Sequence, residues 1–416
     1  MKVAGIVAEY NPFHSGHQYH LEETRRITGA DYCVAVMSGD FVQRGEPAFF
    51  SKYLRTRMAL SCGADLVLEI PSIFAVSSAE DFAACAVALL AGLGVVDVLS
   101  FGSENGDIKP IRAAASLLAQ EGPNLSALLQ AGLREGLTWP QARSQALLSL
   151  AESEEDFPLA KKELDQILAS PNSLLGIEYC KALKRRHCSI QPVTVPRKGQ
   201  GYHDLELDEG QASASALRRA FADKTMDNGH LSHVPPEIRA LYMEGKPLFA
   251  GDCSGILNYR LLALFQEGCA FDDYADVSGD LASRLRHHLL QFADWEGRTR
   301  QLKTRQYTYT RISRALTHLL LGITKEQTAQ AREAGYAPYG RVLGFRREAG
   351  PLMAAIKKQS SIPLVVKTAA ADRMLEGTAL AMFRQDLHAS HVRQVLEREK
   401  YGCVGKNEYN QEICIL

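Results

Sequence analysis

The sequence predicts an α/β fold, a doubly wound parallel sheet with a helical insertion, followed by a mainly α-helical C-terminal region. Two observations predict this class. Short, continuous apolar runs alternate with helical patterns between residues 3 and 101, and such runs are typical of strands buried on both faces of a sheet. From residue 252 onward the pattern is mostly helical and becomes locally basic.

Each expected strand is an apolar run of strand length, and the runs lie at residues 3–8, 31–38, 65–70, 97–101 and 189–195. A first helix is expected to end at Gly29, and later helices are expected at residues 52–61, 79–93 and 174–184. The cap of the last helix is predicted to be Asn172 or Ser173.

Polar groups follow three of these strands. Right-handed crossovers between parallel strands place ligands at the carboxyl ends of the strands. We therefore expect one edge of the sheet to gather His14, Gln43 with Arg44, and Gly102 with Ser103.

The chain is predicted to divide near its middle. Residues 1–233 are expected to form the α/β domain and residues 234–416 the mainly helical region, with a linker beginning at Val234-Pro235-Pro236. A helical insertion at about residues 107–186 is expected to contain helices at 111–120, 125–135, 140–151 and 161–168. A small mixed unit is expected at residues 339–345, 350–358 and 362–366.

The composition is that of an ordinary soluble globular protein. The 416 residues are 46% hydrophobic and 23% charged, and the net charge of −1 excludes a globally basic protein. The nine cysteines include no C-x-x-C pair, so we expect neither a disulfide framework nor a zinc site, and no metal ligands are predicted. No secretion signal and no membrane-length apolar run is found, so a cytoplasmic protein without a membrane partner is expected.

The stretch Val3–His20 carries the clearest chemical signal. Its apolar run leads into the turn Asn11-Pro12, and His14-Ser15-Gly16-His17 follows where a helix begins. A helix N-terminus favours anions, and glycine at residue 16 lets a phosphate approach the backbone. The alternative is a strand–turn–helix that merely carries histidines.

Two further segments have the chemistry of phosphate contacts. Pro196-Arg197-Lys198-Gly199 is a basic turn after the fifth expected strand, and Gly201-Tyr202-His203 continues the loop. The segment Ser213–Arg219 opens a helix with serines and two arginines, which suits phosphate binding. Taken alone, this segment is more typical of a serine-capped surface helix, but with His14 and His17 upstream we favour a phosphate contact.

The segment Leu281–Leu321 is rich in Arg and Lys, and Asp294 and Glu296 are its acidic residues. Basic side chains interleaved with tyrosines fit RNA, because charge binds the phosphate backbone and rings stack on exposed bases. The alternative is a solvated helix face. The candidate RNA-binding residues are Lys303, Arg305, Tyr307, Arg311 and Arg314, with Tyr309 as a second candidate for stacking.

The motif His14-Ser15-Gly16-His17, preceded by Asn-Pro-Phe, resembles the HxGH signature of the nucleotidylyltransferase superfamily, whose fold is Rossmann-like. The strings GIVAEYNPFHSGHQYH, MSGDFVQRGEPA, FGSEN, SPNSLLGIEY, VPRKG and KTRQYTYTRISR together resemble the tRNA(Met) cytidine acetate ligase family. They occur in family order over about three quarters of the chain.

This resemblance implies an ATP-dependent ligase that modifies RNA. Acetate and ATP would give acetyl-adenylate and pyrophosphate, and the acetyl group would pass to N4 of the wobble cytidine of elongator tRNA(Met), forming N4-acetylcytidine. Positioning and preorganised positive charge would stabilise the phosphates, with Mg²⁺ expected alongside ATP. The implied catalytic residues are His14 and His17. The implied ATP-binding residues are Val7, Ala8, Glu9, Tyr10, Asn11, Pro12, Phe13, His14, Ser15, Gly16, His17, Gln18, Tyr19, His20, Gly102, Asn172 and Arg197.

Two other functions compete with this interpretation. A small-molecule cofactor nucleotidylyltransferase would use the same motif but leave the C-terminal half without a role. A non-catalytic RNA-binding protein with a vestigial nucleotide site would not need an intact motif. Under the favoured interpretation, a fragment that ends near Pro235 is expected to keep the ATP site without modifying tRNA.

Overall fold

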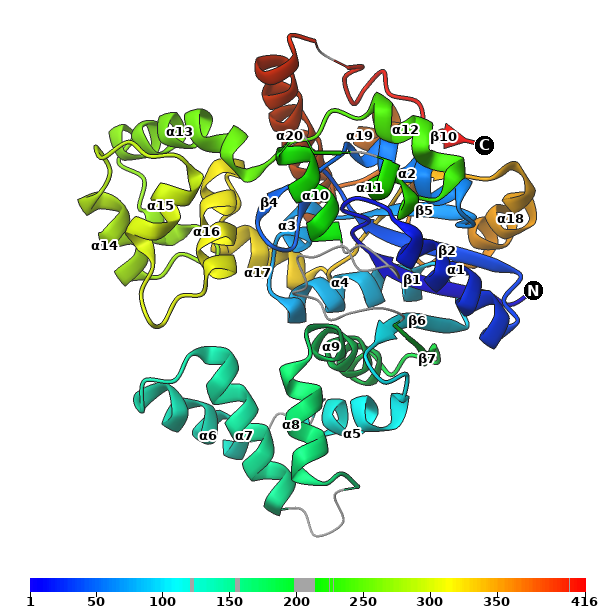
Figure 1. The fold of residues 1–416 in the computed structure, drawn as a ribbon, viewed down its shortest axis with the longest axis horizontal. Helices are drawn as coiled ribbons and strands as arrows, with labels where there is room; N and C mark the ends of the chain where they lie inside the picture. Colours follow the sequence, from blue (N-terminus) through cyan, green and yellow to red (C-terminus); the bar gives the residue numbers. More distant parts are fainter. Residues whose placement is uncertain (120–122, 154–157, 198–213, 224, 227, 404) are drawn as a thin grey trace.

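The computed structural model describes residues 1–119, 123–153, 158–197, 214–223, 225–226, 228–403 and 405–416. Its centre is a sheet with the strand order β10-β8-β5-β2-β1-β6-β7, and β9 pairs with β8 (Figure 1). The first five strands in the chain to enter this sheet run parallel: β1 (Val3–Ala8), β2 (Tyr32–Ser38), β5 (Leu66–Ile70), β6 (Val98–Ser103) and β7 (Gln191–Pro196). The predicted doubly wound parallel sheet is therefore confirmed.

Helices cover both faces of the sheet because the buried strand residues alternate between two cores. Val3 and Val34 belong to one apolar cluster, whereas Ala4 and Cys33 belong to another on the opposite face. Helices α1 (Ser15–Thr28) and α2 (Lys52–Ser61) pack on the second cluster; α4 (Ala79–Gly92), α5 (Ile108–Ala119) and α9 (Pro171–Arg185) pack on the first. Burial on both faces explains why each strand is a continuous apolar run.

Two predicted boundaries were wrong in detail. Gly102 and Ser103 lie within β6, which continues beyond its apolar part because both residues pair with β7. The N-cap of α9 is Ser170, and Pro171 is the first helical residue, where proline needs no N–H partner. Asn172 and Ser173 therefore lie in the first turn of α9, with their side chains free for other contacts.

Helices α6 (Pro123–Arg134), α7 (Trp139–Ser153) and α8 (Lys161–Ala169) form a lobe that projects from the sheet at the bottom of Figure 1. A second lobe, at the left, contains α13 (Ser254–Gln266), α14 (Gly279–His287), α15 (Trp295–Leu302) and α16 (Tyr309–Leu321). The shorter elements near the sheet are α3 (Ser72–Ala75), α10 (Ala214–Ala222), α11 (Asn228–Ser232), α12 (Arg239–Glu244) and α17 (Lys325–Glu333).

The central sheet continues across the boundary expected at residues 233/234. Strand β8 (Gly340–Phe345) pairs antiparallel with β5, while β9 (Leu364–Val365) and β10 (Cys414–Ile415) pair with β8. Val234 and Ile238 are fully buried in the same core as Phe13. The remaining C-terminal helices are α18 (Gly350–Gln359), α19 (Ala371–Met374) and α20 (Gly377–Tyr401).

A buried charged cluster joins the N-terminal and C-terminal parts around the ammonium group of Lys52. Its Nζ atom donates to Ser390 Oγ at 2.7 Å and to both carboxylate oxygens of Glu69 at 3.0 Å. Glu408 and Asp40 lie at 3.3 and 3.8 Å. Each of these five side chains is at most 5% exposed as a residue. The three carboxylates outnumber the one ammonium group, and buried Arg341 and Arg393 supply the further positive charge that lets the carboxylates stay ionised.

Candidate active site

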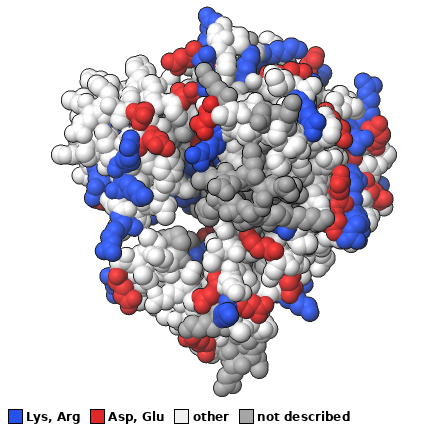
Figure 2. Space-filling view, viewed as in Figure 1, with Lys and Arg blue, Asp and Glu red and all other residues white. Residues whose placement is uncertain are grey.

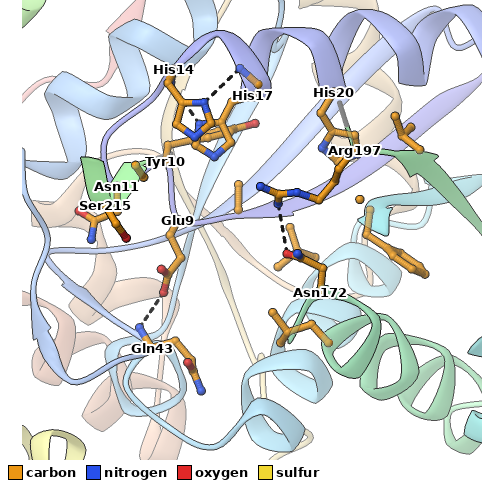
Figure 3. A pocket seen from close by; sticks show the side chains of 18 of the residues that line it. Glu9, Tyr10, Asn11, His14, His17, His20, Gln43, Asn172, Arg197 and Ser215 are labelled. Carbon is orange, nitrogen blue, oxygen red and sulfur yellow. Dashed lines mark hydrogen bonds between the residues drawn. The ribbon is translucent and has the colours of Figure 1, made fainter. Parts of the chain in front are cut away.

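A pocket lies at the carboxyl ends of β1, β6 and β7, where the doubly wound topology predicts a ligand (Figure 3). One wall is the turn from β1 into α1, another is the start of α9 with the end of β7, and a third is the segment after β3 (Phe41–Val42). The pocket thus gathers segments that lie far apart in the sequence.

The two motif histidines occupy the start of α1. His14 is the N-cap, and its Nδ1 accepts a hydrogen bond from the Gly16 amide at 3.0 Å. His17 Nδ1 accepts from the His14 amide at 3.2 Å, and the two ring centroids are 3.9 Å apart. Because both Nδ1 atoms accept, each neutral imidazole carries its proton on Nε2. The motif therefore forms a capping box with two ring N–H donors left for a ligand.

These imidazoles are neutral near pH 7. Burial, with Arg197 as a smaller cause, lowers the pKa of His14 to about 3 and the pKa of His20 to about 4. Burial also holds the pKa of His17 well below its usual value, with His14 as a further cause. The positive charge expected at this motif therefore comes from the arginines and the helix N-terminus, whereas the histidines act as neutral donors.

Arg197 stands across the pocket from the motif and is positioned by α9. Its Nη1 donates to Asn172 Oδ1 at 3.2 Å, and the Asn172 amide donates to Glu104 Oε1 at 2.9 Å (Figure 3). Ser173 Oγ donates to the other oxygen of Glu104 at 2.6 Å. A Cβ on Gly102 would lie 3.3 Å from Arg197 Cγ, so glycine there leaves room for the arginine side chain.

Glu9 and Arg218 complete the polar wall near the turn. Glu9 Oε1 accepts a hydrogen bond from the main-chain amide of Gln43 at 2.7 Å. Burial raises the pKa of the Glu9 carboxyl, although this hydrogen bond and nearby Arg44 act to lower it. Arg218 donates hydrogen bonds to the main-chain carbonyl of Asn11 at 2.6 Å and to Ser215 Oγ at 3.2 Å. This arrangement fixes Arg218 at the edge of the pocket, with its charge beside the β1–α1 turn.

Most residues that the sequence implies for ATP line this pocket, whereas Pro12, Phe13, Ser15 and Gln18 stand outside its lining. Phe13 is fully buried beneath the turn, and its carbonyl accepts from the Tyr242 hydroxyl. The amide of Ser15 donates to the His233 carbonyl at 3.0 Å. The implied residues that do line the pocket are Val7, Ala8, Glu9, Tyr10, Asn11, His14, Gly16, His17, Tyr19, His20, Gly102, Asn172 and Arg197.

Sequence reasoning missed the apolar side of the pocket. Phe82, Phe101, Leu175 and Tyr179 line it, and the rings of Phe101 and Tyr179 have centroids 5.5 Å apart. Phe101, Leu175 and Tyr179 lie within the strings FGSEN and SPNSLLGIEY that carry the family resemblance, but apolar periodicity does not distinguish a pocket wall from a core. Lys198, Gly199, Tyr202, His203 and Ser213 lie outside the described residues.

The candidate RNA-binding segment has one exposed part and one packed part. Lys303 and Arg305 are exposed and precede α16. Figure 2 shows Lys and Arg side chains along the lower left edge of the lobe that contains α13 to α16. Tyr307 is 7% exposed, and its hydroxyl bonds to Ser278 at 2.5 Å, so its ring is covered. Tyr309, 44% exposed, is the tyrosine that faces solvent.

The other two arginines of this segment make contacts within the protein. The guanidinium of Arg311 lies 5.1 Å from the ring centroid of Tyr307. Arg314 pairs with Asp276 at 2.9 Å and is 13% exposed in its side chain. The exposed cations are therefore those that precede the helix.

The described residues contain no group of three or more His, Cys, Asp or Glu side chains that could hold a metal ion. Along the same described ranges, no helix is both long and apolar enough to cross a membrane.

Comparisons with known proteins identify the family. Residues 1–407 match the family model described as HIGH Nucleotidyl Transferase. A tRNA(Met) cytidine acetate ligase of Acetivibrio thermocellus is 39% identical over 375 residues, covering 88% of each chain. One of Thermoanaerobacter sp. strain X514 is 38% identical over 397 residues and covers 94% of each.

Solved structures extend this similarity to the whole fold. The apo crystal structure of Thermotoga maritima TmcAL superimposes with a TM-score of 0.92 at 27% identity, covering 100% of both chains. The same protein bound with alpha-thio ATP gives a TM-score of 0.90 at 28% identity. Agreement in sequence, fold and motif over nearly the full length leaves one assignment: the chain belongs to the tRNA(Met) cytidine acetate ligase family of HIGH nucleotidyl transferases.

Proposed function

We propose that this protein activates acetate with ATP and transfers the acetyl group to N4 of the wobble cytidine of elongator tRNA(Met). The observation that carries the proposal is the pair of histidines at the start of α1, whose ring N–H donors face a pocket edged by Arg197 and Arg218. The family relationship supports the substrate, because the relatives carry that name.

In the first step, the polyphosphate of ATP binds at the N-terminus of α1. An acetate oxygen attacks the α-phosphorus, the bond to the β-phosphate oxygen breaks, and pyrophosphate leaves as acetyl-adenylate forms. Charge grows on the leaving oxygens, which the Nε2–H groups of His14 and His17 stabilise together with Arg197. Neutral histidines suit this role because they donate hydrogen bonds without first having to take up a proton.

ATP usually brings Mg²⁺ to such reactions. The described residues form no cluster of metal ligands, and we assign no protein ligand to the ion. Magnesium commonly binds through substrate phosphates and water with few protein ligands, which fits a pocket of this composition. The apolar wall at Phe101 and Tyr179 offers a surface for the adenine ring.

In the second step, the N4 amine of cytidine attacks the acetyl carbon. The carbon–nitrogen bond forms, the acyl–phosphate bond breaks, and AMP leaves as the amine loses a proton. The weak amine depends on being held next to the mixed anhydride, so a separate RNA-binding surface is required. The exposed cations Lys303 and Arg305 suit binding to the RNA phosphate backbone, and the exposed ring of Tyr309 suits stacking on a base. Such a reaction takes place where tRNA is found, in the cytoplasm.

Acetate-dependent ATP–pyrophosphate exchange, measured with and without tRNA(Met), tests the proposal. We expect exchange with acetate in the absence of tRNA, and N4-acetylcytidine when tRNA(Met) is added. A cofactor nucleotidylyltransferase would instead require a phosphorylated small-molecule acceptor. Exchange that ignores acetate would overturn the proposed first step, and exchange without acetylated tRNA would overturn the second.

A further inference from the structure

The segment Gln43–Glu46 contains the tight turn between β3 and β4 (Glu46–Pro47). One face of this segment lines the pocket, and the other face packs against α16. Gln43, Arg44 and Glu46 line the pocket, and the Gln43 amide holds the carboxylate of Glu9 at 2.7 Å. Figure 3 shows Glu9 and Gln43 on the opposite side of the pocket from His14 and His17. The turn thus forms the wall that lies away from the phosphate-binding end.

The outer face of this turn rests on α16. The carbonyl of Gly45 accepts two hydrogen bonds, from Ser313 Oγ and from Thr317 Oγ1, each at 2.7 Å. Both hydroxyls are buried, and they lie one helical turn apart on the same face. A Cβ on Gly45 would lie 2.4 Å from the backbone nitrogen of Arg314, and Gly45 has φ 75°, so only glycine fits against the helix.

Helix α16 also begins beside the candidate RNA-binding residues. Thr308 caps it, Tyr309 is its first residue, and Lys303 and Arg305 precede it. The hydroxyls that hold Gly45 lie within the next turns of the same helix. A rigid helix therefore connects the proposed tRNA surface with the pocket wall opposite the motif histidines.

From this geometry we infer that Ser313 and Thr317 are positioning residues for acetyl transfer. Acting through the Gly45 carbonyl, they hold the turn at residues 43–46 so that Arg44 and Glu9 keep their places on the side of the pocket where tRNA arrives. The inference rests on the proposed function for its consequence, but the two hydrogen bonds that carry it are independent of any substrate.

Thr317 is the better probe, because Ser313 Oγ also accepts from the Trp295 indole at 3.2 Å. Thr317→Val removes the hydroxyl and keeps the shape, whereas Thr317→Ser keeps the hydroxyl. Thr299→Val is the matched control: Thr299 is equally buried, and its hydroxyl donates to a helix carbonyl, Trp295 O, at 2.9 Å without touching the turn.

We expect Thr317→Val to lower kcat for tRNA acetylation about two- to tenfold, the range for one lost hydrogen bond, with little change in KM for ATP. Thr317→Ser should restore kcat, and Thr299→Val should resemble wild type. Equal losses in Thr317→Val and Thr299→Val, or no recovery in Thr317→Ser, would overturn the inference.

Amide hydrogen exchange of the peptide spanning residues 41–47 gives a readout that needs no substrate. Exchange of this peptide should quicken in Thr317→Val and stay at the wild-type rate in Thr299→Val, because only the first loses one of the two hydrogen bonds that hold the Gly45 carbonyl. An unchanged peptide in Thr317→Val would also overturn the inference. Absence of acetylation by the wild-type protein would instead remove the proposed function, while the hydrogen-exchange result would still stand.

Discussion

Replacing Lys52 by methionine should weaken the link between the two parts of the chain. The ammonium group contacts Glu69, Glu408, Asp40 and Ser390, and no part of its side chain is exposed. Removing one partner of a buried ion pair typically costs about 3–5 kcal/mol, because the other charge stays buried without compensation. Other cations remain nearby, so we expect the low end, about 3 kcal/mol.

The remaining cations can be identified. Arg341 lies 3.3 Å from Glu69 and bonds to Glu408, and Arg393 lies 3.7 Å from Asp40. Glu69 loses the most, because both of its oxygens bond to Lys52. Burial already raises the pKa of Glu69, against the pull of Lys52 and Arg341. Without Lys52 this pKa rises further.

The cost of Lys52→Met should therefore depend on pH. A carboxyl whose pKa is higher in the folded than in the unfolded state contributes stability below its unfolded pKa and loses that contribution as pH rises through its folded pKa. Glu69 in the variant follows this rule, so the destabilisation should be largest near pH 8. Toward pH 6 it should shrink by about 1–2 kcal/mol, since one proton gives at most about 1.4 kcal/mol per pH unit.

Urea unfolding at pH 6 and pH 8 measures this effect. Adding Glu69→Gln to Lys52→Met removes the uncompensated carboxylate and should restore part of the stability at pH 8. Arg384→Met is the control, because the Arg384–Asp372 pair is about as short, 2.9 Å, but its side chains are 63% and 60% exposed. Such a pair contributes at most about 1 kcal/mol. Equal losses of unfolding free energy in Lys52→Met and Arg384→Met, or a loss in Lys52→Met that does not change with pH, would refute the reasoning.

Three further predictions concern the pocket, the RNA surface and the chain as a whole. His14→Asn keeps an N-cap but removes the Nε2 donor, and His17→Ala removes the other donor. Each variant should lower the rate of acetate-dependent ATP–pyrophosphate exchange by about 10²–10³ and leave the circular dichroism spectrum unchanged. A normal exchange rate would exclude the donor role. Lys303→Ala combined with Arg305→Ala should reduce the slope of log tRNA affinity against log salt by about two at most, and an unchanged slope would mean that these cations face only solvent. A chain cut after Pro235 should be unfolded, as measured by circular dichroism, because it loses strand β8, which pairs with β5, and the buried side chains of Arg341 and Arg393. A folded fragment that catalyses pyrophosphate exchange would contradict this prediction.

The sequence predicts well what depends on local pattern. The β1 strand, the α2 helix and the start of α1 follow from an apolar run, a helical pattern and a histidine motif, and all lie within a few residues of the expected positions. These signals are local because a buried parallel strand must be apolar along its whole length and a helix must satisfy its first amides.

The remainder depends on contacts between distant segments. No local pattern distinguishes Phe101 and Tyr179, which line a pocket, from the apolar residues of the core. Tyr307 was expected to face RNA because it stands among cations, yet its hydroxyl bonds to Ser278, and this partner lies 29 residues away. The expectation that a fragment ending near Pro235 keeps the ATP site rests on a linker signal and a change of pattern and composition, none of which carries information about β8 pairing with β5.

These long-range contacts meet at the segment between β2 and α2. Gly45 is held by α16, and the Ala48 carbonyl accepts from Arg393 of α20, 345 residues away in the chain. Arg55 of α2, fully buried, donates to the Phe50 carbonyl at 3.0 Å and to the Gly39 carbonyl, so it holds both ends of this segment. The same segment therefore contacts the pocket on one side and the C-terminal part on the other. The pocket wall at residues 43–46 is thus held by Ser313 and Thr317, on the helix that follows the proposed tRNA-binding residues Lys303 and Arg305. Buried contacts of this kind join the N-terminal and C-terminal parts of the chain.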